Sequence, residues 1–269
     1  MFILREDLHH TFISGNKWRK LKYHIQEIQN KGYKTVVTFG GAYSNHLLAV
    51  ACAGATYGFE TIGIVRGEPV QNVVLFLCRQ FGMQLHFVSR SAYKDKKQCF
   101  DIVTQNKTDC YFLDEGGAGT LGIKGCTEIW QEVPNYINHV FCACGTGTTL
   151  AGILAGKPTQ HLNTHVHGVM VLNAFEVVNQ MASQYNTEYT LHTQYTLGGY
   201  AKTNRQYLAH LTLFSQCTGI LLDPIYTGKV WLAIQDLAKK QDFEQGANIL
   251  LIHTGGLTGT LGMWQEYPL

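Results

Sequence analysis

The sequence has no block of like charges, no long apolar run and few prolines. Its 269 residues carry 21 Lys and Arg against 19 Asp and Glu, and because these charges are scattered, nothing favours nucleic acid or a membrane surface as a partner. No apolar stretch reaches the roughly 20 residues that a membrane span needs, which argues against a transmembrane helix. Charged residues occur within the first 7 positions, so no secretory signal is expected there, and we predict a cytoplasmic chain.

Closely spaced cysteine or histidine motifs are also missing. The only near pair among the 8 cysteines is Cys142 and Cys144, whereas chelating and redox pairs are usually spaced one residue further apart. We therefore expect reduced, mostly buried thiols, with a catalytic cysteine as the less favoured alternative. The 12 histidines show no metal-binding spacing, so no metal site is predicted.

What the sequence does contain is an alternation of short β-rich runs and helical patterns. Such alternation is typical of βαβ units and predicts an α/β fold with open, mostly parallel twisted sheets and flanking helices. The predicted strands are residues 35–39, 60–65, 84–88, 111–113, 140–143, 165–172 and 249–253. Predicted helices end near residue 29, begin near residue 44, span residues 72–81, and begin near residue 150.

Domain boundaries are weakly marked, because the chain has only 5 prolines and no Pro- or Ser-rich linker. We predict a small domain of residues 44–115 inserted into a large domain of residues 1–43 and 116–269. Open parallel sheets bind ligands at the carboxyl ends of their strands. The motifs that follow predicted strands are therefore the candidates for a functional site.

The first candidate motif is Ser14-Gly15-Asn16-Lys17-Trp18-Arg19-Lys20, a flexible turn that enters a helical pattern. A lysine at such a turn can reach into a cleft, where apolar neighbours lower the pKa of its amine and make it nucleophilic. A lysine at a helix start also opposes the helix dipole, which favours a functional role for Lys17. The alternative is an ordinary solvated lysine.

Two glycine turns follow predicted strands. Residues 40–46 place Ser44 where it can cap a helix, and backbone amides at such a helix start bind a carboxylate or phosphate. Residues 144–149 form a second turn, which is neither a Walker loop nor a complete dinucleotide fingerprint. A generic phosphate cradle is therefore predicted, with simple strand–helix packing as the alternative. A nucleotide-binding oxidoreductase is disfavoured, because no acidic residue completes the fingerprint.

Taken in order, these motifs and several later ones resemble the fold type II family of pyridoxal 5′-phosphate (PLP) enzymes, in the branch of D-cysteine desulfhydrase and 1-aminocyclopropane-1-carboxylate deaminase. The resemblance covers most of the chain. It rests on Arg5-Glu6-Asp7-Leu8, residues 14–20, Ser44-Asn45-His46, Glu115-Gly116-Gly117, Gly145-Thr146-Gly147-Thr148, Gly198-Gly199-Tyr200, residues 223–229 and His253-Thr254-Gly255-Gly256.

The resemblance implies a cofactor in the cleft between two domains, with Lys17 holding PLP as a Schiff base and later moving the proton at the substrate carbon. Lys20 and Lys22 are the alternative anchors. The implied cofactor contacts are Lys17, Asn45, Gly145, Thr146, Gly147, Thr148, Thr149 and Thr254. The implied catalytic or substrate contacts are Lys17, Ser44, Asn45, His46, Tyr200, Tyr226 and Thr227.

The implied reaction is β-elimination with deamination of a small amino acid, in a homodimer. Cyclopropane-opening members carry Glu and an aliphatic residue where this sequence has Thr227 and Thr254, so a D-cysteine desulfhydrase-like enzyme releasing pyruvate, ammonia and sulfide is preferred. A deaminase that releases 2-oxobutyrate and ammonia is one alternative. A truncated, catalytically silent PLP-binding homologue is another, because few residues precede Arg5 and residues 149–198 form a short interval for the family.

Overall fold

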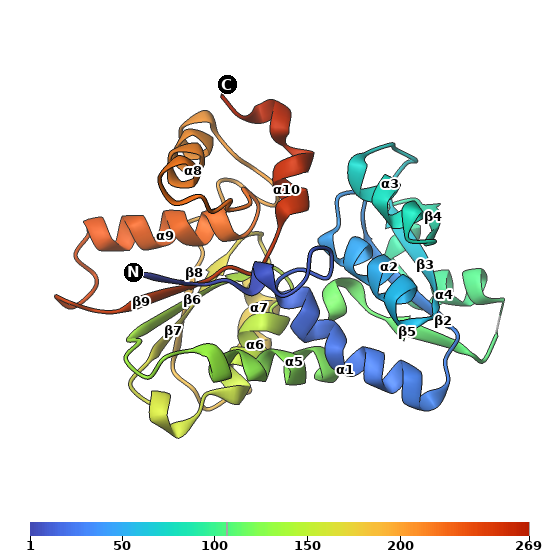
Figure 1. Cartoon of the computed structure of the whole chain (residues 1–269), viewed down its shortest axis with the longest axis horizontal. Helices are drawn as coiled ribbons and strands as arrows, with labels where there is room; N and C mark the ends of the chain where they lie inside the picture. Colours follow the sequence, from blue (N-terminus) through green and yellow to red (C-terminus); the bar gives the residue numbers. More distant parts are fainter. Residues whose placement is uncertain (106, 269) are drawn as a thin grey trace.

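The computed structural model describes residues 1–105 and 107–268. They form two sheets side by side, each built from parallel strands (Figure 1). The larger sheet has the strand order β1-β9-β6-β7-β8, and the smaller one has the order β4-β3-β2-β5. The larger sheet contains β1 (Phe2–Leu4), β6 (His139–Cys144), β7 (His165–Met170), β8 (Tyr189–His192) and β9 (Ile249–Ile252). The smaller contains β2 (Thr35–Gly41), β3 (Glu60–Arg66), β4 (Gln84–Val88) and β5 (Cys110–Leu113).

Helices cover both faces of the larger sheet, with α8 and α9 on one face and α5, α6 and α7 on the other (Figure 1). Each face has its own apolar core. The α-helices are α1 (Asn16–Lys31), α2 (Asn45–Tyr57), α3 (Val73–Gln80), α4 (Lys96–Thr104), α5 (Thr120–Thr127), α6 (Thr148–Gly156), α7 (Phe175–Ala182), α8 (Arg205–Thr218), α9 (Thr227–Lys239) and α10 (Leu257–Gly262). The 3₁₀ helices are η1 (Glu6–Leu8), η2 (Ala92–Lys94), η3 (Glu115–Gly117), η4 (Glu128–Glu132), η5 (Thr159–His161) and η6 (Trp264–Glu266).

The predicted α/β fold with mostly parallel sheets is confirmed, since every strand pair in the described residues is parallel. Strand β4 has the predicted bounds, and the other predicted strands differ by one or two residues at their ends. The short strands β1 and β8 were missed, because three or four residues are too few to show a period.

One domain boundary from the sequence is wrong. Strand β2 was assigned to the large domain, yet it lies between β3 and β5 at the centre of the smaller sheet. Its residues 35–40 are all buried, because helices cover both faces of a strand with a neighbour on each side. The smaller sheet therefore starts at Thr35 and not after residue 43.

Helix composition also bears on the membrane question. Within residues 1–105 and 107–268, none of the helices combines the length and the apolar character required to cross a bilayer.

Candidate active site

A cavity of about 1370 Å³ opens between the two sheets, beside the carboxyl ends of β2, β3, β6, β7 and β9. Its volume exceeds the roughly 300–1,000 Å³ typical of a pocket for one small ligand, so a cofactor and a substrate can occupy it together. The predicted site residues that line it are Lys17, Ser44, Asn45, His46, Gly145, Thr146, Gly147, Thr149, Tyr200, Tyr226 and Thr254. Segments distant in sequence thus meet in one place.

Lys17 lies in the first turn of α1 and is half-buried in this cavity. Removal from water, with Lys20 as a nearby like charge, lowers the pKa of its amine to about 7. The Nζ atom donates a hydrogen bond to Asn16 Oδ1 at 2.7 Å, and Asn16 Nδ2 donates to Thr149 Oγ1 at 2.9 Å. Asn16 therefore links the amine to the first turn of α6.

Gly15 explains how α1 brings Lys17 to this position. Its φ of +64° lies in the left-handed region, and a Cβ there would stand 2.0 Å from the carbonyl oxygen of Thr254. Only glycine allows so close an approach. The Asn16 amide then donates to the same oxygen at 3.3 Å, which joins the start of α1 to the turn after β9. Thr254 is buried and lines the cavity, and its contact with the cofactor stays a prediction.

Lys20 and the start of α6 provide the features that an anion requires. The Lys20 side chain is buried and lines the cavity, and within the described residues no hydrogen bond or ion pair reaches its Nζ. Burial lowers the pKa of Lys20, because a buried cation without a partner is costly. Gly147, with φ of +84°, precedes α6, whose first amides have no partner within the helix. This arrangement fits the phosphate of PLP.

Helix α2 presents three predicted residues. Ser44 caps it, and its Oγ accepts hydrogen bonds from the amides of His46 at 3.2 Å and Leu47 at 3.3 Å. Asn45 Oδ1 accepts a hydrogen bond from Thr258 at the start of α10. The His46 ring is buried, and its Nε2 lies 2.8 Å from Thr38 Oγ1 while Nδ1 has no partner in the described residues. Burial holds the pKa of His46 well below its usual range, so the ring is neutral.

Tyr200 and Tyr226 form another part of the cavity wall. Their rings meet edge to face with centroids 6.3 Å apart, and Tyr226 donates a hydrogen bond to the Tyr200 hydroxyl at 3.5 Å. Burial raises the pKa of Tyr226 well above its ordinary value. The Tyr226 hydroxyl is therefore protonated at neutral pH and donates to Tyr200, which leaves the hydroxyl proton of Tyr200 for a ligand in the cavity.

Two predicted site residues do not face the cavity. Thr227 is fully buried, donates from Oγ1 to Asp223 Oδ1 at 2.7 Å and accepts the Asp223 amide at 3.0 Å. The predicted substrate contact of Thr227 is wrong, because its hydroxyl is used to hold Asp223 at the start of α9. The Thr148 side chain is also fully buried and lies 3.2 Å from the Thr146 hydroxyl. Only the backbone amide of Thr148 remains for the predicted phosphate contact.

Sequence reasoning gave no role to Asn16 and named Lys20 only as an alternative anchor. A signal for Lys20 was present, since a residue three positions after Lys17 lies on the same helix face. Nothing in the sequence indicated that Asn16 would bridge Lys17 and Thr149, because that contact joins the ends of two separate segments.

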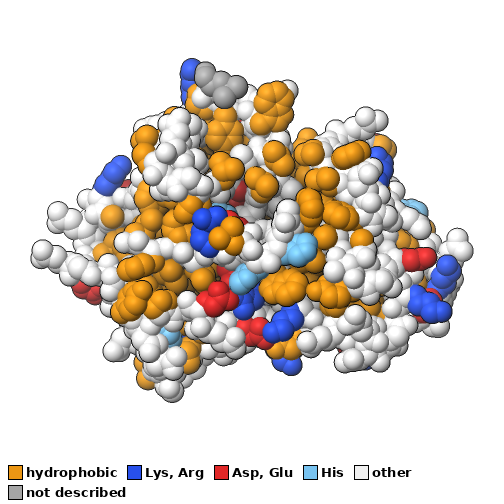
Figure 2. Space-filling view, in the orientation of Figure 1, with side chains coloured by type: hydrophobic (Ala, Val, Ile, Leu, Met, Phe, Trp, Pro, Cys, Tyr) orange, Lys and Arg blue, Asp and Glu red, His pale blue; other side chains and the backbone are white. Residues whose placement is uncertain are grey.

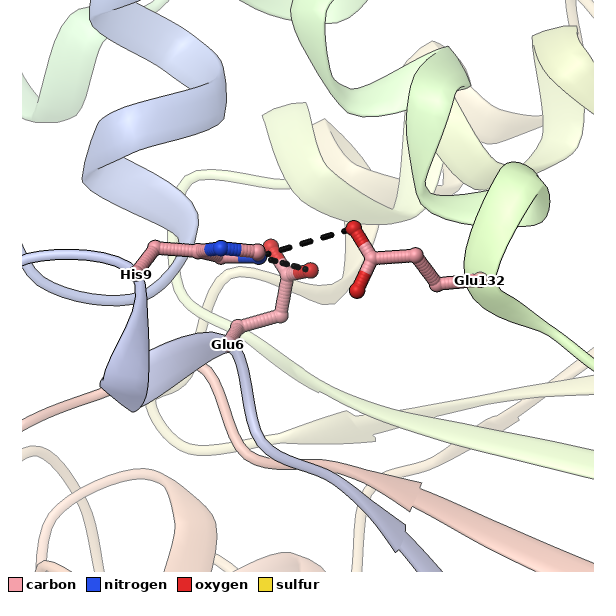
Figure 3. A group of neighbouring side chains, drawn as sticks. All are labelled: Glu6, His9 and Glu132. Atoms are coloured by element: carbon pink, nitrogen blue, oxygen red, sulfur yellow. Dashed lines mark hydrogen bonds and ion pairs between the residues drawn. The ribbon is translucent and has the colours of Figure 1, made fainter.

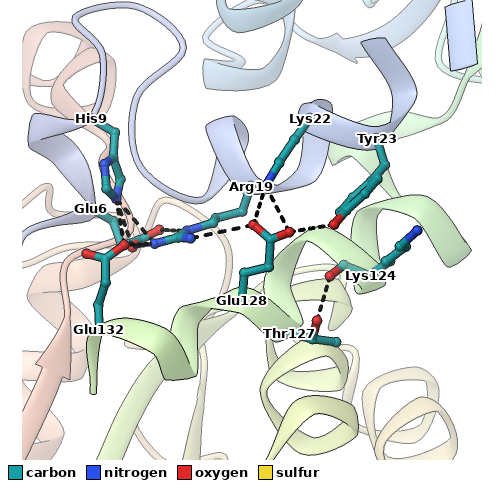
Figure 4. A network of polar contacts seen from close by, with 9 residues as sticks. All are labelled: Glu6, His9, Arg19, Lys22, Tyr23, Lys124, Thr127, Glu128 and Glu132. Atoms are coloured by element: carbon teal, nitrogen blue, oxygen red, sulfur yellow. Dashed lines mark hydrogen bonds and ion pairs between the residues drawn. The ribbon is translucent and has the colours of Figure 1, made fainter. Parts of the chain in front are cut away.

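An ion-pair network fixes α1 beside the cavity (Figure 4). The Arg19 guanidinium binds both carboxylate oxygens of Glu6, at 3.0 and 2.7 Å, and also pairs with Glu132. One turn later, Lys22 and Tyr23 both bind Glu128. Figure 2 shows acidic and basic side chains gathered near the middle of this face. The network joins the N-terminal segment, α1 and η4.

Part of this network has the composition of a metal site. Glu6, His9 and Glu132 bring three ligand atoms within 4.8 Å of one another (Figure 3). Arg19 Nη2 lies among these atoms, 2.7 Å from Glu6 Oε1 and 3.4 Å from His9 Nε2. The guanidinium thus already supplies the positive charge that these carboxylates need. The absence of a metal site stays a prediction from the sequence.

The fold and the cavity define a class of protein, a two-sheet α/β enzyme with a reactive lysine beside an anion cradle. A family model described as "Pyridoxal-phosphate dependent enzyme" matches residues 1–255. The chain belongs to this family of PLP-dependent enzymes, and PLP is its cofactor.

Relatives place the chain more narrowly within the family. A Pyrococcus abyssi protein, provisionally named as a 1-aminocyclopropane-1-carboxylate deaminase, is 30% identical over 99% of this chain and 87% of its own length. A D-cysteine desulfhydrase from Klebsiella pneumoniae is 27% identical over 95% of this chain and 86% of its own. The crystal structure of a homologue of 1-aminocyclopropane-1-carboxylate (ACC) deaminase matches 98% of this chain and 86% of its own chain. The TM-score is 0.85 and the sequence identity is 27%. The predicted family resemblance is confirmed.

Attachment of PLP to the cofactor-free protein is expected to become faster as the pH rises, with a midpoint near 7. The neutral amine of Lys17 is the nucleophile, and its pKa of about 7 sets the pH at which that form appears. The measurement is the rate at which yellow colour develops after PLP is added at a series of pH values. A midpoint close to 10.5, the ordinary value for lysine, would contradict the assignment of Lys17.

Proposed function

We propose that this protein catalyses the β-elimination and deamination of a small amino acid, most simply D-cysteine, with Lys17 as the cofactor anchor. The observation that carries the proposal is the Lys17 amine, whose pKa is lowered to about 7 in a cavity that also holds an anion cradle and two tyrosines. The names of the relatives support a substrate of this class.

The residues of the cavity supply binding and proton transfer. Bound PLP withdraws electrons from the substrate Cα and so makes the Cα proton acidic. The Lys17 amine would accept that proton at Nζ, because burial lowers its pKa and favours the neutral, proton-accepting form. Asn16 Oδ1, at 2.7 Å, keeps Nζ directed into the cavity. Lys20 and the amides at the start of α6 would hold the cofactor phosphate.

The substrate carboxylate and leaving group have separate contacts. The start of α2 would offer the backbone amide of Asn45 and the helix dipole to the carboxylate, because the Ser44 amide already donates to Gly41 O and Ser44 Oγ already accepts the amides of His46 and Leu47. Tyr226, which stays protonated, donates to the Tyr200 hydroxyl, and Tyr200 would donate its own proton to the leaving sulfur. In this proposal, the carboxylate is bound by the start of α2 and the β-substituent by the tyrosine pair.

One position favours D-cysteine over the cyclopropane amino acid, and a second bears on the type of reaction. The residue after Tyr226 is Thr227, whose hydroxyl is bonded to Asp223 and does not line the cavity. This position therefore supplies no acidic side chain to the cavity. Thr254, which lines the cavity, is neutral and would leave the cofactor ring a weaker electron sink than a carboxylate would. A weaker sink suits elimination better than transamination.

The products distinguish the candidate reactions. We expect the yellow protein to release pyruvate, ammonia and sulfide from D-cysteine faster than it releases 2-oxobutyrate from 1-aminocyclopropane-1-carboxylate, as measured by coupled product assays. The opposite order would assign the chain to the deaminases. A yellow protein that releases neither product would correspond to the catalytically silent PLP-binding homologue. A protein that takes up no PLP would refute all three.

Several expectations about the surroundings of the protein stay predictions. These are the homodimer, the lack of nucleic-acid and membrane partners, and the cytoplasmic location. Sedimentation of the PLP-loaded protein would test the homodimer.

A further inference from the structure

Lys229 is a fully buried lysine outside the catalytic cavity. It lies in the first turn of α9, and its side chain has no exposed surface. Its Nζ donates to three backbone carbonyl oxygens, those of Thr196 at 2.7 Å, Gly199 at 3.0 Å and Val171 at 3.3 Å. All three N–H donors of an ammonium are therefore used, and within the described residues no carboxylate forms an ion pair with it.

The three carbonyls belong to two turns that form walls of the cavity. Val171 directly follows β7 and precedes Leu172 and Asn173, which line the cavity. Thr196 and Gly199 belong to the turn that carries Tyr200. Lys229 thus fastens both walls to α9.

The turn around Tyr200 has a backbone conformation that requires support from neighbouring groups. Leu197, Gly198, Gly199 and Ala201 all have positive φ, at 55°, 95°, 139° and 54°. Two of these residues carry side chains that disfavour this conformation, so surrounding contacts must hold it in place. The hydrogen bonds from Lys229 to Thr196 and Gly199 clamp the turn directly before Tyr200.

Helix α9 also fixes the second tyrosine. Tyr226 stands immediately before its first residue, and Asp223 accepts the amides of Ile225 and Tyr226 at 3.0 and 2.9 Å. The same helix start therefore carries Tyr226 directly and holds Tyr200 through Lys229. The position of this helix start therefore determines the 3.5 Å contact between the Tyr200 and Tyr226 hydroxyls.

We propose that Lys229 is a positioning residue, which sets the place of Tyr200 relative to Tyr226 by holding the Tyr200 turn through its ammonium group. It touches neither cofactor nor substrate, since it does not line the cavity. The kinetic part of the proposal rests on the proposed function. Because a small displacement of an oriented group can lower a rate by about a hundredfold, loss of the clamp has a kinetic consequence.

The test is a pair of substitutions, Lys229→Met and Tyr200→Phe, made singly and together. Lys229→Met is expected to keep PLP fixable by borohydride on Lys17 and to lower kcat for D-cysteine at least about tenfold, with a smaller change in KM. In the Tyr200→Phe background, the same change is expected to lower kcat less than about twofold, because Lys229 acts through Tyr200. An equal loss in both backgrounds would overturn the proposal.

Hydrogen exchange tests the clamp without any turnover. Amides of residues 171–174 and 196–202 are expected to exchange faster in Lys229→Met, and unchanged exchange in both turns would overturn the proposal even if the proposed function fails. Lys239→Met, an exposed lysine at the end of the same helix, is the matched control and should leave exchange and kcat unchanged. If Lys229→Met does not fold, Lys229→Gln, which keeps two N–H donors, replaces it in both backgrounds.

Discussion

Replacement of Lys17 by alanine is expected to abolish the covalent attachment of PLP and to lower turnover about a thousandfold or more. The substitution removes both the amine that holds the cofactor and the base that accepts the Cα proton, and positioned acid–base groups alone contribute about 10² to 10⁴ in rate. The measurement is mass spectrometry of the protein after borohydride reduction, together with the rate of pyruvate release from D-cysteine.

Two neighbouring lysines provide the controls. Lys22 is paired with Glu128 at 2.7 Å and does not line the cavity, so Lys22→Ala should retain attachment and turnover. Lys20 lines the cavity without a partner, so Lys20→Ala should weaken PLP binding while Lys17 still becomes labelled. Labelling of the Lys17→Ala protein at Lys20 or Lys22 would move the anchor to that residue.

Replacement of Arg19 by methionine is expected to destabilise the protein by about 3–5 kcal/mol. The Glu6 side chain has no exposed surface and receives two hydrogen bonds from Arg19, with His9 Nε2 at 3.1 Å as a further contact, so the substitution leaves a buried carboxylate without its guanidinium partner. Methionine fills similar volume, which separates the loss of charge from the loss of packing. The measurement is the free energy of unfolding from denaturant titration.

A matched variant on the same helix separates burial from charge. Lys31 pairs with Glu27 at 2.6 Å, but its side chain is 58% exposed, so Lys31→Met removes an ion pair that water already screens. Its unfolding midpoint should stay close to that of the unaltered protein. Equal shifts for Arg19→Met and Lys31→Met would show that burial of the Glu6–Arg19 pair contributes nothing.

The sequence predicted the strands that carry the site because each is an apolar run next to a turn signal. Strand β2 and the following helix cap at Ser44 were recognisable from a β-rich segment, two glycines and a capping serine. The sheet to which β2 belongs was not recognisable. A strand buried on both faces shows no alternation that would identify its neighbours, so its pairing with β3 and β5 needed the structure.

The candidate site was likewise predicted only in part. Lys17, the residues Gly145, Thr146, Gly147 and Thr149, and the two tyrosines follow from motifs that resemble a family, and all of these line one cavity. Thr227 shows the limit of this reasoning. Its hydroxyl faces Asp223, four residues earlier, because the Asp223 carboxylate lies against the first residue of α9 and accepts both the amide and the hydroxyl of Thr227. A motif lists residue types in order but does not state which way each side chain points.

The sequence by itself determined the class of fold, the cofactor and the candidate anchor, because each depends on local patterns and on motifs that stay together along the chain. The tertiary structure decided which of those side chains meet. The pKa of Lys17 near 7 arises from burial and from Lys20, and the bridge through Asn16 to Thr149 joins separate segments. The hydrogen bonds of Lys229 exist only because α9 packs beside the Tyr200 turn. Burial and long-range contact are properties of the folded chain, and no local pattern encodes them.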